Sequence, residues 1–225
     1  MEREGETGDI RALEMEDGSR VQGGLFIDAT GFRRRLIGEM GAKWISYGAV
    51  LPVNRAMPFW VDIPKGAEIP PVTLAWAQKS GWMWQITTQD RYGCGYVYSD
   101  AHTSPDQAKA EIEAALGHEI HPRNDIKIDA GRLDRNWIGN CVALGLSSSF
   151  LEALEATSIH GTVVQLMLLS ALLAGPDERA RQAFNGYLRA RWMITAISSA
   201  CTISARDATA PFGACRHQPS RARDG

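Results

Sequence analysis

The 225-residue chain lacks a charge excess of one sign, closely spaced cysteines and long apolar runs. Its 24 basic and 26 acidic side chains leave a net charge of −2, which does not favour a nucleic-acid or anionic-membrane partner. None of its four cysteines shows CxxC or CxxH spacing, so we expect free thiols in a reducing compartment rather than a zinc site or a disulfide framework. The longest apolar stretch, residues 163–174, is too short to cross a bilayer and contains Gln165 and Ser170. Because no secretory apolar segment opens the chain either, we expect a soluble, cytoplasmic protein with no metal site and no nucleic-acid or membrane partner.

The first half of the chain predicts strands. Residues 8–31 are typical of a hairpin with its turn at Asp17-Gly18, followed by a buried strand over 25–31 that ends in a glycine turn. Residues 44–100 are rich in aromatic and β-branched residues and contain five prolines. This composition favours a sheet with irregular loops over a helix bundle.

Helix signals begin after residue 100. Ser104-Pro105-Asp106-Gln107 combines an N-cap serine, a first-turn proline and a capping-box glutamine, and the helix should end at Gly117. Residues 126–145 return to strands, and two further helices are expected over 161–174 and 176–190. The sequence therefore predicts an α/β fold with α+β character.

Two tryptophans spaced by one residue, Trp82 and Trp84, are the most informative local feature. In a strand, positions i and i+2 face the same side, so the two indoles would form one aromatic wall. Either a core strand with two large side chains or one wall of a binding site explains this spacing, and the spacing alone does not separate them.

Residues 141–160 combine an apolar strand ending at Gly145, a run of small polar residues and a helix start. The free N–H groups and the dipole at a helix N-terminus favour an anion there. Glu152 and Glu155 both fit the description of a solvated carboxylate at a helix start, so local sequence does not distinguish their roles.

Together these segments resemble the flavin-dependent tryptophan halogenase family. The match rests on Gly-Trp-Met-Trp-Gln-Ile at 81–86, Gly-Cys-Gly-Tyr-Val-Tyr-Ser at 93–99, and Leu-Glu-Ala-Leu-Glu-Ala-Thr-Ser at 151–158. The family signature is WxWxIP, and Thr87 stands at its proline position. The resemblance covers about residues 8–191.

The resemblance implies roles for particular residues. Glu155 matches the active-site glutamate beside the substrate carbon. Thr157 and Ser158 match the pair whose backbone amides hold the halide. Leu146 and Ile159 match positions that touch the flavin. Trp82 and Trp84 would line the wall between flavin and substrate tunnel as part of the catalytic site.

The same resemblance implies the reaction. A halogenase of this family uses reduced FAD, O₂ and chloride or bromide to halogenate an electron-rich carbon of a small aromatic substrate. A separate flavin reductase supplies the reduced FAD, and a homodimer is the state that the family suggests. Two alternatives stay open: an FAD-dependent monooxygenase that does not halogenate, and a non-catalytic remnant.

The domain organisation follows from the resemblance. Residues 1–43 and 126–175 would form a partial FAD-binding module like that of flavin monooxygenases, and residues 44–125 a mixed substrate-side sheet with its helix. Residues 176–225 would form a C-terminal helix and an altered tail. Neither the GxGxxG turn of the flavin site nor the catalytic lysine is found, so we expect a truncated fragment with weak or no activity.

The segment after Arg191 departs from the family. Trp192-Met193-Ile194 has no amphipathic pattern, but its codons read from the third base encode Asp-Asp, and allowed codons continue as a family-like acidic-aromatic helix. We therefore hypothesise a shifted reading frame near Arg191, with residues 192–225 poorly packed and the polar ending disordered.

Overall fold

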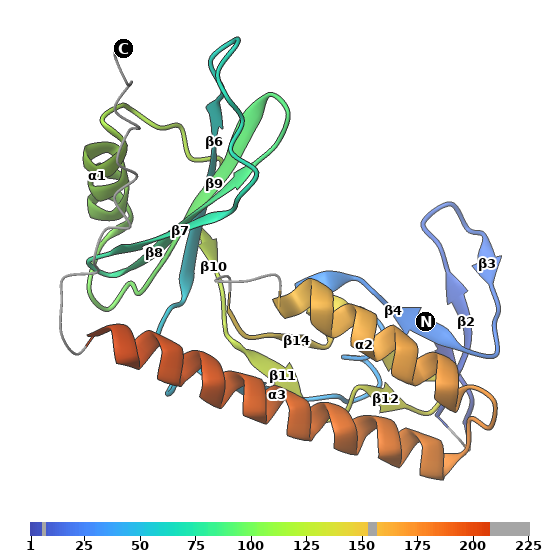
Figure 1. Cartoon of the computed structure of the whole chain (residues 1–225). Helices are drawn as coiled ribbons and strands as arrows, with labels where there is room; N and C mark the ends of the chain where they lie inside the picture. The colour runs from blue at the N-terminus through green and yellow to red at the C-terminus, as the bar shows by residue number, and fades with distance from the viewer. Residues whose placement is uncertain (6–7, 153–156, 208–225) are drawn as a thin grey trace. The chain divides into compact units, whose positions relative to one another are not determined.

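The computed structural model describes residues 1–5, 8–152 and 157–207, with residues 200–207 described by their backbone alone. The chain divides into two compact units. Met1–Pro52 and Asp129–Cys201 belong to the first, and Val53–Ile128 belongs to the second. Strands and helices are mixed along the chain (Figure 1), which confirms the expected α/β class with α+β character.

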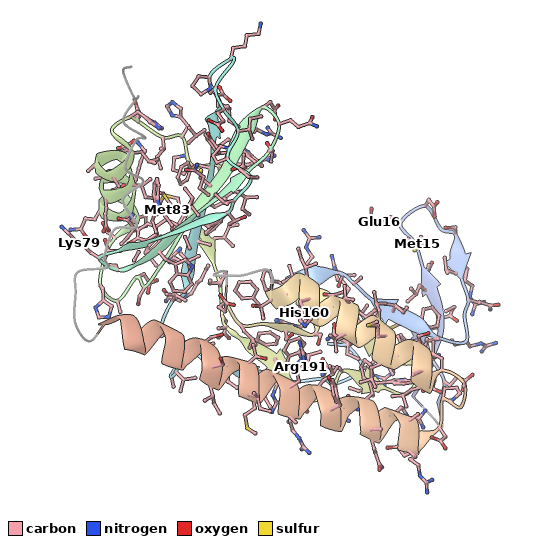
Figure 2. The ribbon with its side chains drawn as sticks, in the orientation of Figure 1. Met15, Glu16, Lys79, Met83, His160 and Arg191 are labelled. Atoms are coloured by element: carbon pink, nitrogen blue, oxygen red, sulfur yellow. The ribbon has the colours of Figure 1, made fainter. Side chains whose placement is uncertain are left out.

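The first unit contains three small sheets. Their orders are β1-β2-β3, β12-β13-β4 and β14-β11-β5. The strands are β1 (Glu2–Arg3), β2 (Ile10–Glu14), β3 (Arg20–Val21), β4 (Phe26–Asp28), β5 (Trp44–Ser46), β11 (Gly131–Leu133), β12 (Trp137–Ile138), β13 (Cys141–Ala143) and β14 (Ser149–Phe150). The predicted hairpin is present as β2 and β3, with Met15 and Glu16 at its turn (Figure 2).

β4 and β13 are parallel neighbours, with Ile27 opposite Val142. Each of these two strands ends in a turn opened by a glycine with positive φ: Gly31 at +67° and Gly145 at +61°. The turns continue as short 3-10 helices, η1 (Gly31–Arg33) and η2 (Gly145–Ser147), which pack against each other. Parallel pairing thus brings two chain segments more than 100 residues apart to the same edge of the sheet.

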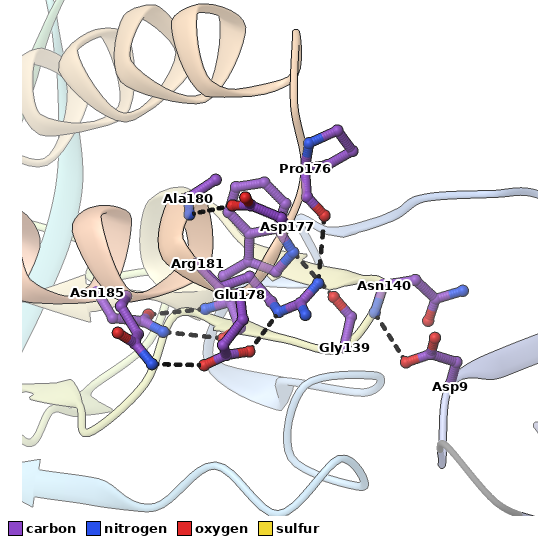
Figure 3. Close-up of polar contacts among 11 residues, drawn as sticks. Asp9, Gly139, Asn140, Pro176, Asp177, Glu178, Ala180, Arg181 and Asn185 are labelled. Carbon is purple, nitrogen blue, oxygen red and sulfur yellow. Dashed lines mark hydrogen bonds and ion pairs between the residues drawn. The ribbon is translucent and has the colours of Figure 1, made fainter.

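Two helices complete this unit: α2 (Thr157–Leu172) and α3 (Glu178–Asp207). Asp177 Oδ1 accepts the Ala180 N–H at 2.8 Å and so caps the start of α3. Figure 3 shows Arg181 beside this start, donating to the Glu178 carboxylate at 2.9 Å and to the Pro176 carbonyl at 3.3 Å. α2 begins four residues before the expected position 161, and α3 continues well beyond position 190.

The expectation of poor packing from residue 192 onward is wrong for Trp192 and Ala196, which are both buried. The Trp192 ring lies against Gly161 of α2, where a Cβ would stand 2.2 Å from the ring. Trp192 and Ala196 continue a series of buried residues at every fourth position of α3, Ala180, Phe184 and Leu188, while Met193 and Ile194 are exposed. The segment after Arg191 therefore keeps the buried face of the preceding helix.

The second unit is a five-stranded sheet of order β10-β6-β9-β8-β7 with one helix, α1 (Pro105–Leu116). Its strands are β6 (Arg55–Asp62), β7 (Leu74–Gln78), β8 (Gly81–Thr87), β9 (Arg91–Tyr98) and β10 (Ile126–Lys127). We expected a mixed sheet here, but every pairing within it is antiparallel, and the parallel pair β4–β13 lies in the first unit.

One face of this sheet packs against α1. Met83, which Figure 2 labels, joins Phe59, Tyr96 and Ile112 of α1 in a buried apolar cluster. The start of α1 has the predicted capping box: Ser104 Oγ accepts the Gln107 N–H, and Gln107 Oε1 accepts the Ser104 N–H. Gly117 ends the helix in a left-handed conformation, as expected.

Two thiols are buried, one in each unit. Burial raises the pKa of the Cys94 thiol to about 11. Burial raises the pKa of Cys141 to about 12, and the nearby Asp28 carboxylate adds to this effect. Both cysteines are free and will be protonated at neutral pH.

Candidate functional site

The first turn of α2 is a polar helix end. Thr157 Oγ1 donates to the buried Glu152 carboxylate at 2.6 Å, and Thr162 Oγ1 donates to the Ser158 carbonyl at 2.7 Å. The first turn of the helix contains no acidic residue. Because the first N–H groups of a helix have no intrahelical acceptor, the backbone of Thr157 and Ser158 can serve an anion. The Thr157 hydroxyl is already bonded to Glu152, which leaves the backbone N–H groups as the donors.

The neighbouring turn η2 packs against α2 and presents one apolar side chain. Ser147 and Ser148 are fully buried, whereas Leu146 between Gly145 and Ser147 is 36% exposed. Ile159, in the first turn of α2, is 71% exposed. His160, labelled in Figure 2, is also an exposed residue of α2. Both residues predicted to contact the flavin, Leu146 and Ile159, are therefore accessible apolar side chains on adjacent elements.

The buried carboxylate of Asp28 stabilises the η2 turn. Asp28 is fully buried at the end of β4; its Oδ2 accepts the N–H groups of Leu36 and Ile37, each at 2.9 Å. Its Oδ1 accepts the Thr30 N–H and hydroxyl and the Ser147 hydroxyl. Burial alone would raise the pKa of Asp28, but these hydrogen bonds outweigh it and hold the pKa below its ordinary value.

The surroundings of this turn fit a flavin. At Gly31, whose φ is +67°, the position of a Cβ faces open space, so a ligand can approach the main chain closely. Leu146 and Ile159 supply apolar contacts, and the amides of Thr157 and Ser158 supply donors. These residues would hold the cofactor and a halide on one side of the unit.

The indole pair lies on the face of the second unit's sheet that is opposite α1. Trp82 and Trp84 alternate with Met83, whose side chain packs under α1. Trp84 pairs with Gly95 of β9, and a Cβ on Gly95 would stand 2.0 Å from the Trp84 ring. Trp82 is 4% exposed, while Trp84 is partly exposed. Trp82 is thus a core residue, and Trp84 is the indole that a ligand can reach.

The predicted site residues fall into three groups. Leu146, Thr157, Ser158 and Ile159 come together on η2 and α2 of the first unit. Trp82 and Trp84 belong to the second unit, so their convergence with the first group stays a prediction. Glu155 lies outside the described residues. The roles assigned to the predicted domains also stay predictions.

Sequence reasoning missed two buried polar residues that support the turn, Asp28 and Gln165. Its description of Glu152 as a solvated carboxylate is wrong, because that residue is buried and accepts the Thr157 hydroxyl. A signal was present for Asp28 and Gln165. Asp28 and Thr30 form an Asx-type turn, the Asp-x-Thr pattern at a strand end. Gln165 is an isolated amide in an apolar helical run, which is typical of a buried side chain with defined partners.

No group of three metal-binding side chains gathers in the described part of the chain. No described helix is long and apolar enough to span a membrane.

Comparison with known proteins decides the family. The family model for tryptophan halogenase matches residues 1–220. This chain belongs to the tryptophan halogenase family. The matched range extends past Arg191, so the segment with the hypothesised frame shift lies inside it.

Several relatives of this tryptophan halogenase family member are named as halogenases. Tryptophan 6-halogenase SttH of Streptomyces toxytricini is 39% identical over 65% of the chain and 29% of its own length. Tryptophan 7-halogenase KtzQ of Kutzneria sp. is 32% identical over 94% of the chain and 41% of its own length. The flavin-dependent halogenase BrvH from Brevundimonas sp. BAL3 superposes with a TM-score of 0.79 at 36% identity, over 90% of this chain and 41% of that one. The chain thus spans less than half the length of these relatives.

Proposed function

We propose that this chain is part of a flavin-dependent halogenase that halogenates an electron-rich aromatic carbon with reduced FAD, O₂ and chloride or bromide. The observation that carries the proposal is the juxtaposition in one unit of an accessible apolar turn, Leu146, and a helix whose first turn, from Thr157 and Ser158, contains no acidic residue. A flavin needs the first feature and a halide needs the second. Membership of the family supports joining them into one site.

Each residue then has a defined task. The N–H groups of Thr157 and Ser158 bind and orient the halide, and Leu146 with Ile159 excludes water from it. When bound, reduced FAD would give two electrons to O₂, and the halide would give the other two, so that O₂ is reduced while the halide is oxidised to hypohalous acid. Glu155 would stand beside the substrate carbon, and Trp82 with Trp84 would separate the flavin from the substrate. The buried Glu152 holds the Thr157 hydroxyl, so that the halide meets backbone donors only.

Flavin-dependent halogenases take reduced flavin from a separate reductase and act on aromatic substrates. We propose that this chain likewise takes reduced flavin from a separate reductase and acts on a small aromatic substrate. A cytoplasmic location and a homodimer stay predictions.

A chimaera tests the proposal. Residues 8–191 would replace the matched segment of BrvH, and the purified protein would receive FAD, a flavin reductase, NADH, O₂, bromide and indole as an aromatic probe. We expect a brominated product by mass spectrometry that disappears when bromide is omitted. An oxygenated product formed without bromide would instead identify a monooxygenase.

Ser158→Pro and Ser158→Ala form a matched pair in this chimaera. Proline is tolerated in the first turn of a helix because the N–H that it lacks has no intrahelical acceptor. It removes one donor to the halide, and a hydrogen bond to a charged group contributes about 1.5–3 kcal/mol. We therefore expect the KM for bromide to rise at least about tenfold in Ser158→Pro and to stay unchanged in Ser158→Ala. Equal values in the two variants would contradict the halide site.

The chain alone supplies a second test. FAD would be added to the purified 225-residue protein and followed by its absorbance through gel filtration. Stoichiometric retention would show that this segment binds the cofactor by itself. Passage without flavin, together with an inactive chimaera, would favour the non-catalytic remnant.

A further inference from the structure

Gln165 is a buried amide that joins α2 to the Leu146 turn. It is 0% exposed and lies on α2 two turns after Thr157. Its Oε1 accepts the Gly145 N–H at 2.9 Å, and its Nε2 donates to Ser148 Oγ at 2.5 Å. One side chain therefore holds the residues immediately before and after the Leu146–Ser147 pair.

The same turn is held from two other elements. Ser148 Oγ donates to Asn136 Oδ1 at 2.6 Å, just before β12. Ser147 Oγ donates to Asp28 Oδ1 at 3.2 Å, at the end of β4. Asn136 and Asp28 attach the turn to the sheet, whereas Gln165 attaches it to the helix. With both serines held inward, Leu146 is the residue of the turn that faces outward.

An amide at this position costs free energy unless both of its ends are bonded, because an unsatisfied buried polar group costs about 1–3 kcal/mol. An apolar side chain would fill the same volume without that requirement, as Val164 and Leu169 do elsewhere on this helix. Unlike an apolar side chain, the amide can fix the orientation of the turn. It accepts from one end of the turn and donates to the other, so it fixes the orientation of the turn relative to the helix axis.

We propose that Gln165 is a positioning residue: through Gly145 and Ser148 it sets Leu146, the flavin-contacting side chain, against the anion-binding first turn of α2. This inference rests on the proposed function. Thr157 and Gln165 are eight residues apart on one helix, about 12 Å along its axis at 1.5 Å per residue. Because the helix is rigid, the hydrogen bonds of Gln165 fix the distance between the halide site at Thr157–Ser158 and the flavin contact at Leu146.

The test uses the full chain with isotope labels and two NMR readouts. Sodium bromide would be titrated against sodium sulfate at matched ionic strength while the backbone amides of Thr157 and Ser158 are followed. The methyl resonances of Leu146 and Ile159 would report the position of the two flavin-facing side chains without any ligand. Gln165→Met removes both hydrogen bonds with little change in volume. Leu169→Ala is the control, because it destabilises a buried position of the same helix that has no part in these bonds.

We expect Gln165→Met to weaken bromide binding at least about threefold and to shift the Leu146 methyl resonances, while Leu169→Ala changes neither. The comparison with Leu169→Ala separates positioning from mere stabilisation, because that variant destabilises the same helix and leaves the bonds of Gln165 to Gly145 and Ser148 in place.

Three outcomes decide the matter. Unchanged bromide affinity and unchanged methyl resonances in Gln165→Met would overturn the positioning role. Equal losses in Gln165→Met and Leu169→Ala would also overturn it, because stability alone would then explain them. If bromide moves no amide in the unsubstituted chain, the proposed halide site fails, and the Leu146 and Ile159 methyl resonances alone decide the role of Gln165.

Discussion

Replacing Asp28 with asparagine should destabilise the first unit strongly although the two side chains have nearly the same shape. The carboxylate accepts five hydrogen bonds: two at Oδ2 from the Leu36 and Ile37 amides, and three at Oδ1 from Thr30 and Ser147. An asparagine has one acceptor end and one donor end. Whichever way it turns, its NH₂ group faces at least one backbone N–H.

The magnitude follows from this count. In the better orientation the NH₂ group faces the Thr30 N–H, which loses its acceptor at a cost of about 1–3 kcal/mol. The two bonds from Leu36 and Ile37 become neutral, and charge-assisted bonds are about twice as strong as neutral ones. Together we expect a loss of about 2–4 kcal/mol. With a urea slope of about 2 kcal/mol/M, the midpoint should fall by about 1–2 M.

Pulse-labelling hydrogen exchange at increasing urea, read by mass spectrometry, would measure this shift separately for each unit. Peptides from Val53–Ile128 provide an internal reference whose midpoint should not move. Thr30→Val is the matched variant, since it keeps the carboxylate and removes one hydroxyl that donates to it. That hydroxyl also accepts the exposed Arg35 N–H, where water can replace it, so the substitution should cost only about 1 kcal/mol. A first-unit midpoint in Asp28→Asn that stays within about 0.3 M of the unsubstituted chain, or an equal shift in both units, would refute the reasoning.

The pH dependence has a definite sign. Because the pKa of Asp28 is lowered in the folded chain, its contribution is complete above the unfolded value of about 3.9. The contribution is lost as the pH falls through the lower folded value. The difference in the free energy of unfolding between the unsubstituted chain and Asp28→Asn should therefore be constant from pH 7 to about pH 4 and should become smaller below that.

The remaining predictions concern close contacts and thiols. Gly95→Ala places a methyl 2.0 Å from the Trp84 ring and should cost about 1–3 kcal/mol in the second unit, measured as its urea midpoint. Gly161→Ala should cost the first unit a similar amount, because the methyl meets the Trp192 ring. Gly186→Ala, in open space on α3, should instead stabilise it by about 0.4–1 kcal/mol. Cys94 and Cys141 should resist iodoacetamide at pH 8 in the folded chain and react in urea; fast alkylation of either residue in the folded chain, located by peptide mass spectrometry, would contradict their burial.

Features set by neighbouring residues could be predicted from the sequence. The α1 capping box joins Ser104 to Gln107, three residues away, and the structure confirms it. The facing of Trp82 and Trp84 to one side follows from strand alternation alone. These predictions need no knowledge of distant segments.

The support of the candidate site could not be predicted in the same way. Asp28 and Ser147 are 119 positions apart, and Gln165 and Gly145 are 20 apart, so only the fold brings them together. Likewise Gly161 leaves room for the Trp192 ring, and this partner on another helix cannot be read from the periodicity of α3 itself. Long-range polar pairs were therefore the part that sequence reasoning missed.

The contact between Trp84 and Gly95 has a consequence for the evolution of the family. The indole occupies the volume in which any side chain at position 95 would have to begin. The two positions, on neighbouring strands, can therefore change only together. Homologous chains that carry a residue larger than glycine at the equivalent of Gly95 should have given up the second indole of the pair.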